Sequence, residues 1–158
     1  MSLVDHGLPL TKLTNTLPAP VLKELLIYYG YPISYKGLYD TSLIAAEISA
    51  NYKYWVVGDS YSSPTHPEYA TTTAIVTGVR TNGCKVFGYV PIGQSTQALT
   101  VAEIKTRIDE WVVVGVDGIF LDEFGFDYGN TRAKQIEIVD YVLRVCRFAP
   151  IHGLLRIS

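Results

Sequence analysis

The sequence is poor in cysteine, in excess charge and in long apolar runs, and each shortage excludes a class of protein. Its 158 residues include two cysteines, Cys84 and Cys146, each inside an apolar run and far from the other, so neither a disulfide scaffold nor a zinc site is indicated. A net charge of -2 provides no uniform basic surface for nucleic acid or anionic lipid. No apolar stretch without charge or glycine reaches the length of about 18 residues that a membrane-spanning helix needs. We therefore expect neither nucleic acid nor a membrane as partner.

The composition indicates one folded domain behind a short extension. Hydrophobic residues make up 48% of the chain and charged residues 18%, a balance typical of a chain that buries a core. Residues 1–23 have neither a basic start nor a sustained apolar run, so we expect no secretory signal peptide and a cytoplasmic or virion-associated location. We interpret these residues as an N-terminal extension and residues 24–158 as a single domain.

Short apolar runs alternate with segments of helical pattern. Four runs indicate buried strands, at residues 25–29, 54–57, 85–90 and 118–121. The capping-box pattern S/T-x-x-E predicts that helices begin at Thr65 and Thr100. Two further helices are predicted to begin at Asp40 or Thr41 and near Thr131.

Each predicted helix carries apolar side chains that we expect to pack against a sheet. The helix after the first strand is expected to bury Leu43, Ile44 and Ile48. The remaining stripes are Ile104, Ile108, Trp111 and Val112 in the helix from Thr100, and Ile136, Val139, Val142, Leu143 and Cys146 in the helix from Thr131.

The spacing of the runs predicts the fold class. The strands begin near residues 25, 54, 85 and 117, so successive starts are 29, 31 and 32 residues apart. This spacing fits one strand, one helix and two short loops, and it predicts an α/β fold of parallel strands with right-handed crossovers. Two architectures fit: an incomplete (β/α) barrel of four βα units with a candidate fifth strand at residues 153–157, and an open doubly wound parallel sheet.

Chain length favours the open sheet, whereas the residues at the end of the first strand do not. A complete (β/α)8 barrel typically has about 250 residues, which favours the open sheet for a shorter chain. However, the first predicted strand ends in Tyr28–Pro32 (YYGYP), which lacks the glycine-rich turn of a doubly wound nucleotide-binding protein.

Acidic residues follow two of the predicted strands, and parallel strands bring their carboxyl ends to one edge of a sheet. Asp122 and Glu123 end the fourth strand. Because adjacent residues of a strand point to opposite sides, both can face the same site only if the chain bends there. We therefore expect at most one of them to be catalytic, with a partner from another strand. Asp59 is the best candidate partner, followed by Asp127, although Asp59 fits a turn or helix cap equally well.

Aromatic residues at the same edge point to a carbohydrate ligand. Tyrosine rings stack on the apolar faces of sugar rings, and carboxylates supply the acid, base or nucleophile of glycoside hydrolysis. The candidate substrate-binding residues are Tyr29, Tyr31, Tyr61, Tyr89, Phe124, Asp127 and Tyr128. Each single tyrosine has the alternative interpretation of an ordinary boundary residue. The spacing of the acids matches no known ion-binding loop, so we expect no metal and no cofactor.

The segment Val116–Glu123 (VDGIFLDE) resembles the hallmark of the spherulin-4-like glycoside hydrolases and the related endo-alpha-1,4-polygalactosaminidases. The likeness extends to the strand ends Tyr28–Pro32 and Lys85–Val90 and to the helix from Ile104 to Trp111. It covers residues 25–145. The segment Gly125–Arg132 also looks like barrel proteins found among phage and prophage structural genes.

This resemblance implies a (β/α)8 barrel enzyme acting on an amino-sugar polysaccharide. Asp122 takes the place of the main catalytic carboxylate, with Glu123 beside it, and Tyr29, Tyr31 and Tyr89 form the aromatic platform. The family's further catalytic glutamate comes from a strand beyond the fourth, whereas residues 153–158 carry no acid. We therefore expect a domain that acts on such a polysaccharide with impaired activity or that descends from an enzyme that did. The alternative is a non-catalytic carbohydrate-binding or phage virion-associated structural module.

A barrel with only four or five strands exposes strand edges and one side of its core. Exposed edges and apolar faces favour association. We therefore expect that the chain self-associates or that a partner chain covers the open barrel edge.

Overall fold

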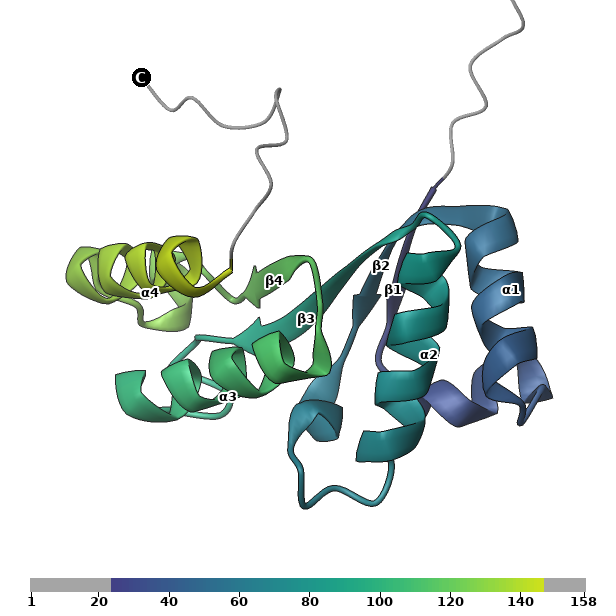
Figure 1. Cartoon of the computed structure of the whole chain (residues 1–158). Helices are drawn as coiled ribbons and strands as arrows, with labels where there is room; N and C mark the ends of the chain where they lie inside the picture. Colours follow the sequence, from purple (N-terminus) through teal and green to yellow (C-terminus); the bar gives the residue numbers. More distant parts are fainter. Residues whose placement is uncertain (1–23, 147–158) are drawn as a thin grey trace, which may run out of the picture.

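The computed structural model describes residues 24–146, which form one parallel sheet of four strands with helices between them (Figure 1). In sheet order the strands are β1 (Glu24–Tyr28), β2 (Tyr52–Val57), β3 (Lys85–Pro91) and β4 (Gly118–Asp122). The helices are α1 (Thr41–Asn51), α2 (Tyr69–Thr81), α3 (Val101–Val114) and α4 (Arg132–Val145). Three short 3-10 helices, η1 (Pro32–Gly37), η2 (Asp59–Ser62) and η3 (Phe126–Tyr128), follow β1, β2 and β4. The predicted alternation of strand and helix is confirmed.

Side-chain caps fix three of the helix starts at the predicted positions. The Asp40 carboxylate accepts hydrogen bonds from the amides of Ser42 and Leu43, both at 2.9 Å. At α3 the capping box forms, because the Thr100 hydroxyl accepts from the amide of Glu103 while the Glu103 carboxylate accepts from the amide of Thr100. The Thr131 hydroxyl accepts from the amide of Lys134 and starts α4.

The predicted helix start at Thr65 is wrong. Helix α2 begins at Tyr69, and Glu68 caps it without a side-chain hydrogen bond. The amide of Glu68 bonds to the imidazole Nδ1 of His66 instead, at 3.0 Å. Pro67 follows His66, and the residue before a proline is disfavoured in helical conformation. The capping pattern was therefore present in a segment that forms turns.

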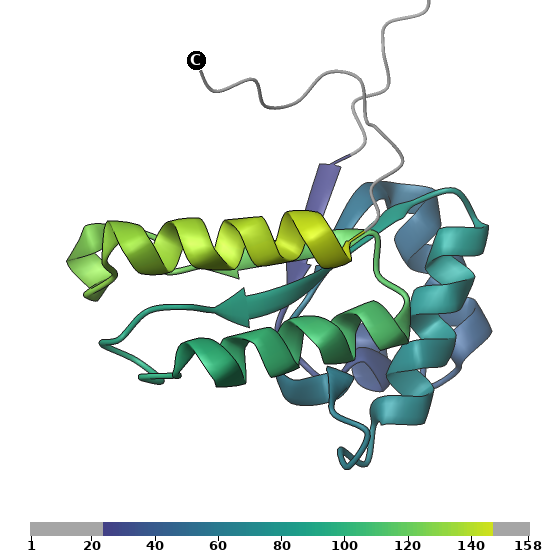
Figure 2. The same ribbon diagram turned by 60° about the vertical axis from the view of Figure 1, so that its left-hand side comes forward.

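All four helices pack on one face of the sheet. Strand partners that share this face include Trp55, paired with Val86, and Val57, paired with Gly88. Trp55, Val57 and Val86 are buried in one core cluster with residues of every helix. Figure 2 shows α3 and α4 side by side along the strands. A doubly wound sheet needs helices on both faces, so that alternative is wrong and the arrangement is that of part of a (β/α) barrel.

The opposite face of the sheet, which would face the inside of a barrel, is partly open. Leu25 and Ile27 of β1 lie on it and are 50% and 42% exposed. Across the sheet the same face carries half-buried Phe87 and Phe120. On the helix side Leu26 and Tyr28 are only half-buried against the core, so the prediction of a buried strand is wrong for β1.

Three side chains that were predicted to pack inward are exposed. Leu43 lies on the outside of α1, where Ile44 and Ile48 are buried as predicted. On α4 the buried positions are Gln135, Ile138 and Val142, while Ile136 and Leu143 face solvent. The predicted stripe on α4 was thus displaced from the buried face of that helix.

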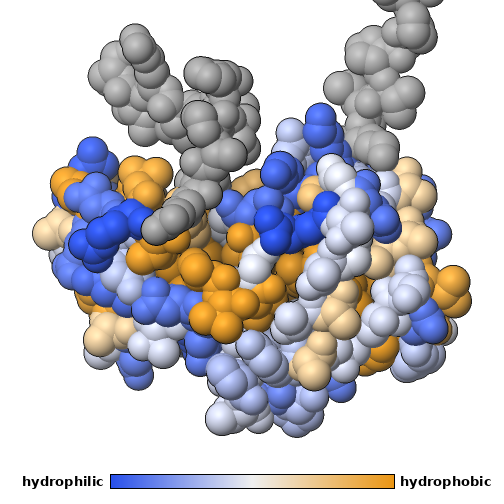
Figure 3. Space-filling view, viewed as in Figure 1, coloured by the Kyte–Doolittle hydropathy of each residue, from blue (hydrophilic) through white to orange (hydrophobic). Residues whose placement is uncertain are grey.

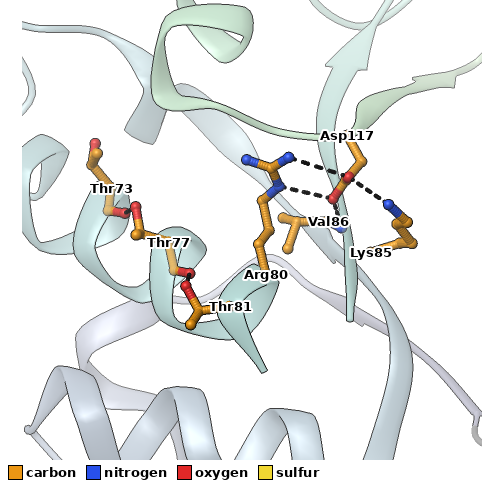
Figure 4. Close-up of polar contacts among 7 residues, drawn as sticks. All are labelled: Thr73, Thr77, Arg80, Thr81, Lys85, Val86 and Asp117. Carbon is orange, nitrogen blue, oxygen red and sulfur yellow. Dashed lines mark hydrogen bonds and ion pairs between the residues drawn. The ribbon is translucent and has the colours of Figure 1, made fainter. Parts of the chain in front are cut away.

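A half-buried carboxylate anchors the amino end of β4 (Figure 4). Asp117 accepts hydrogen bonds from the amide of Val86 at 3.0 Å, from Arg80 Nε at 3.0 Å and from Lys85 Nζ at 3.0 Å. Burial raises the pKa of Asp117, but these hydrogen bonds outweigh it and hold the pKa below its ordinary value. The figure also shows hydroxyls along α2, where Thr73, Thr77 and Thr81 each donate to the carbonyl four residues earlier.

The N-terminal extension and the candidate fifth strand at residues 153–157 lie outside the described residues. Within residues 24–146, no helix has the length and apolar character needed to cross a membrane.

Candidate functional site

The carboxyl ends of the four strands meet at one edge of the sheet, and Asp122 lies there as the last residue of β4. Its carboxylate accepts a hydrogen bond of 2.8 Å from the hydroxyl of Tyr89 on the neighbouring strand β3. The ring of Tyr89 meets the ring of Tyr29 edge to face, with centroids 5.0 Å apart. The structure thus brings together three of the predicted site residues, from the end of β1, from β3 and from β4.

Burial and the nearby acids raise the pKa values of Tyr89 and Tyr29. Burial, the hydrogen bond to Asp122 and the nearby charges of Asp122 and Glu123 raise the pKa of the Tyr89 phenol well above its ordinary value. Burial and the charge of Asp122 also raise the pKa of Tyr29. Both phenols therefore stay protonated near neutral pH and can donate hydrogen bonds to the acids or to a ligand.

The chain bends immediately after Asp122. Glu123 has a φ of 55°, in the left-handed region, and its amide donates a hydrogen bond of 2.8 Å to the Asp122 carboxylate. The Glu123 carboxylate turns to the loop between β3 and α3, where it accepts from the hydroxyl of Thr96 and lies against Gly93. A Cβ at position 93 would overlap that carboxylate. Asp122 and Glu123 can face the same site only if the chain bends between them, and it does bend here.

Hydrogen bonds tie the loop after β3 to the loop after β4. The amide of Ile92 donates to the carbonyl of Asp122 at 3.1 Å, and the amide of Gln94 donates to the carbonyl of Tyr128 at 2.8 Å. Lys134 of α4 donates to the carbonyl of Ile92 at 2.6 Å. Burial lowers the pKa of Lys134. The two loops therefore form one connected wall beside the acids.

The predicted aromatic residues near the ends of β1 and β2 differ in exposure. Tyr29 and Tyr31 are 51% and 57% exposed. Tyr61 is 4% exposed, and its ring packs against Tyr31 and His66. Tyr61 thus lies beneath the exposed aromatic surface and supports it.

The remaining predicted residues lie around this centre. Asp127 and Tyr128 are exposed in η3, and Phe124 is half-buried against the core. The side chain of Asp59 lies outside the part of the chain that the structure describes, but η2 begins at Asp59. The ring of Tyr29 lies over Gly58, so the turn that contains Asp59 is next to the aromatic group.

Sequence reasoning missed the residues that reach the site from the loops and from the start of α4. These are Gly93, Thr96, Asn130, Lys134 and Gln135. The contacts of Gly93, Thr96 and Lys134 join segments that are remote along the chain. Asn130 and Gln135 bond to carbonyls within 12 residues, but these bonds follow no helical or strand pattern. The glycine at 93, between an apolar strand and a polar loop, was the one local sign of a close approach.

A pocket of about 330 Å³ lies beside this site, between the loop after β2 and the outer side of α3. It is lined by Ser60, Ser63, Leu99, Glu103, Thr106, Arg107 and Glu110, none of which was a predicted site residue. Several of its polar groups already have partners: Glu103 belongs to the cap of α3, and Arg107 donates to Gln97 at 2.8 Å. In residues 24–146 no three His, Cys, Asp or Glu side chains gather in a way that could hold a metal ion.

No family model and no curated protein matches the sequence. Among solved structures, a variant of the glycoside hydrolase domain of PelA from Pseudomonas aeruginosa is similar, with 14% identity, a TM-score of 0.45, and coverage of 77% of this chain and 53% of that one. A second structure of that domain has 14% identity, a TM-score of 0.42, and coverage of 77% and 51%. The chain spans about half the length of these structures. This likeness is too distant to carry a conclusion about activity or substrate.

Proposed function

We propose that this chain is a glycoside-hydrolase-like domain that acts on an amino-sugar polysaccharide, with Asp122 as the main catalytic carboxylate. The observation that carries the proposal is the grouping of Asp122 with Tyr89 and Tyr29 at the carboxyl end of a barrel-type sheet. Enzymes with this type of fold place their catalytic residues at that end of the strands. The resemblance of residues 116–123 to the spherulin-4-like hydrolases supports the same assignment.

The chemistry of the group fits the substrate class. The Tyr89 hydrogen bond holds the Asp122 carboxylate in one orientation, as a nucleophile or base requires. The charges of Asp122 and Glu123 attract a cation, and the free amine of an amino sugar is protonated at neutral pH. The exposed rings of Tyr29 and Tyr31 offer stacking surfaces for sugar rings.

Hydrolysis tests this proposal. Wild-type chain and Asp122→Asn are incubated with galactosamine- and N-acetylgalactosamine-containing polysaccharides, and released reducing ends are measured. We expect release by wild type and a loss of at least about 100-fold in Asp122→Asn, because the substitution removes the charge and keeps the shape. Asp140→Asn, an exposed acid on α4, is the matched control and is expected to retain full activity. No release by folded wild type on either polymer contradicts the proposal.

A second candidate function is non-catalytic carbohydrate binding. The observation that favours it is the exposure of Tyr29 and Tyr31, which need no second carboxylate to hold a glycan. Binding without product release selects it. In that case Tyr31→Ala weakens binding about 10-fold, as expected for one lost stacking contact, while Asp122→Asn leaves glycan affinity within about twofold.

A further inference from the structure

Three successive backbone carbonyls that follow Asp122 are held by side-chain amides from the start of α4. Asn130 Nδ2 donates to the carbonyl of Glu123 at 2.6 Å and to that of Gly125 at 3.3 Å. Gln135 Nε2 donates to the carbonyl of Phe124, between them, at 2.7 Å. Asn130 and Gln135 are each 4% exposed. Two buried amides thus donate to three successive carbonyls of a turn that belongs to neither a strand nor a helix, and the carbonyl of Gly125 also accepts from the amide of Tyr128 at 3.2 Å.

The turn needs such support because its first residue is strained. The backbone of Glu123 lies in the left-handed region, which is unfavourable for a residue that carries a side chain. The turn at residues 123–125 is half-buried, and carbonyls that leave a strand and are partly shielded from water are destabilised unless they find donors. Asn130 and Gln135 supply these donors, so the bend depends on them.

The bend determines where the two acids point. Because the chain reverses at Glu123, the amide of Glu123 reaches back to the Asp122 carboxylate while its own carboxylate lies against Gly93 and Thr96. An extended backbone at Glu123 would break the contact with the Asp122 carboxylate and would carry the two acids to opposite sides of the strand.

We propose that Asn130 and Gln135 are positioning residues for the carboxylate pair Asp122 and Glu123. They hold the turn at residues 123–125 and thereby keep Asp122 against Tyr89 and Glu123 against the loop after β3. Their role in catalysis rests on the proposed function, whereas their role in orienting the acids does not.

The ionisation of Tyr89 reports whether Asp122 keeps its position, and measuring it needs no substrate. The ionisation of Tyr89 is followed by NMR of the tyrosine ring carbons between pH 8 and 11.5, with Tyr89→Phe to assign the signal. In wild type we expect Tyr89 to stay protonated over this range, since burial and the hydrogen bond to Asp122 raise its pKa. In Asn130→Ala and Gln135→Met, Asp122 is released, and we expect Tyr89 to ionise with a midpoint closer to the ordinary value of about 10.

A matched control separates positioning from the general loss of an amide. Asn51 Nδ2 also donates to a backbone carbonyl, that of Glu47 at 2.8 Å, but it lies at the end of α1. Asn51→Ala is expected to leave the Tyr89 titration unchanged. If Asn130→Ala does not fold, Asn130→Ser and Gln135→Met carry the test.

The outcomes distinguish the positioning role from the proposed function. Folded variants in which Tyr89 stays protonated as in wild type overturn the positioning role. If wild type hydrolyses amino-sugar polysaccharide, the variants are expected to lower kcat at least about 10-fold with KM within about twofold, because alignment of the reacting groups is lost while glycan contacts remain. If wild type hydrolyses nothing, the proposed function fails and the Tyr89 titration still decides the positioning role.

Discussion

The indole of Trp111, on α3, lies directly against the backbone of Gly88 in β3, so closely that a Cβ at position 88 would overlap the ring. The same indole donates a hydrogen bond of 3.0 Å from Nε1 to the carbonyl of Tyr89. One side chain thus packs α3 onto the sheet and fixes the strand residue whose hydroxyl holds Asp122. Trp111 therefore connects the core to the candidate site.

Gly88→Ala is expected to destabilise the chain by about 2 to 3 kcal/mol, because the added methyl forces α3 away from β3 in a tightly packed core. Urea unfolding followed by circular dichroism measures this change. Val113→Ala, at an exposed position of the same helix, is the control and is expected to change stability by less than about 0.5 kcal/mol. Equal stabilities of the two variants contradict the packing assigned to Trp111.

Asp117→Asn is expected to cost about 2 kcal/mol at pH 7, since it weakens charge-assisted hydrogen bonds to Arg80, Lys85 and the amide of Val86. The pKa of Asp117 is below its ordinary value in the folded chain. Its stabilisation is therefore present above about pH 4 and is lost as the pH falls through the lower, folded pKa. The difference between wild type and Asp117→Asn should shrink between pH 5 and pH 2 in urea unfolding.

The exposed ion pair of Lys36 and Glu47 provides the comparison for Asp117. Glu47→Gln is expected to change stability by less than about 1 kcal/mol, because water and salt screen surface pairs. If Glu47→Gln lowers the unfolding free energy at pH 7 as much as Asp117→Asn does, partial burial does not strengthen the hydrogen bonds of Asp117.

Tyr89 makes stability depend on alkaline pH. Its pKa is raised in the folded chain, so its contribution is fully present below the ordinary phenol pKa of about 10 and is lost as the pH rises through the folded value. Between pH 9 and pH 11 the unfolding free energy of Tyr89→Phe is expected to fall less than that of wild type. Tyr39→Phe, which alters an exposed tyrosine, should follow wild type; an identical slope for Tyr89→Phe would contradict the environment assigned to Tyr89.

We propose that a second copy of the chain covers the open side of the sheet. In the described residues β1 and β4 are the sheet edges, and Leu25 and Ile27 expose apolar surface on the open face. Leu43 of α1 and Leu143 of α4 are exposed as well, on the outer sides of their helices. Figure 3, viewed as in Figure 1, shows further apolar residues exposed across the middle of the molecule. Edges and apolar patches of this kind favour association.

Sedimentation of the purified chain tests the self-association. We expect a concentration-dependent dimer or larger species, and dissociation in the double variant Leu25→Lys with Ile27→Lys. Val113→Lys, at an exposed position of α3, is the control and should leave association intact. A monodisperse monomer with a high, cooperative melting transition contradicts the proposal.

Local sequence determined the order and limits of most elements. Asp40, Thr100 and Thr131 begin helices because a side-chain oxygen next to the first turn satisfies amides that the helix cannot, which is a matter of a few neighbouring residues. The apolar runs around Val86 and Ile119 become strands, and Asp122 ends the last of them as predicted. These features depend on contacts over one or two turns of chain.

Only the tertiary structure decided which faces are buried and how the acids are held. Leu43, Ile136 and Leu143 have an apolar pattern like their buried neighbours, but each lies on the side of its helix where no described element packs. Whether an incomplete barrel or a doubly wound sheet forms depends on which side of the sheet the crossovers take, and both have the same spacing along the chain. The bend at Glu123 depends on Asn130 and Gln135, which lie within 12 residues of it but whose side-chain amides belong to no helical or strand pattern. The Glu123 carboxylate then meets Thr96, 27 residues away, because the sheet places the loop after β3 beside the loop after β4.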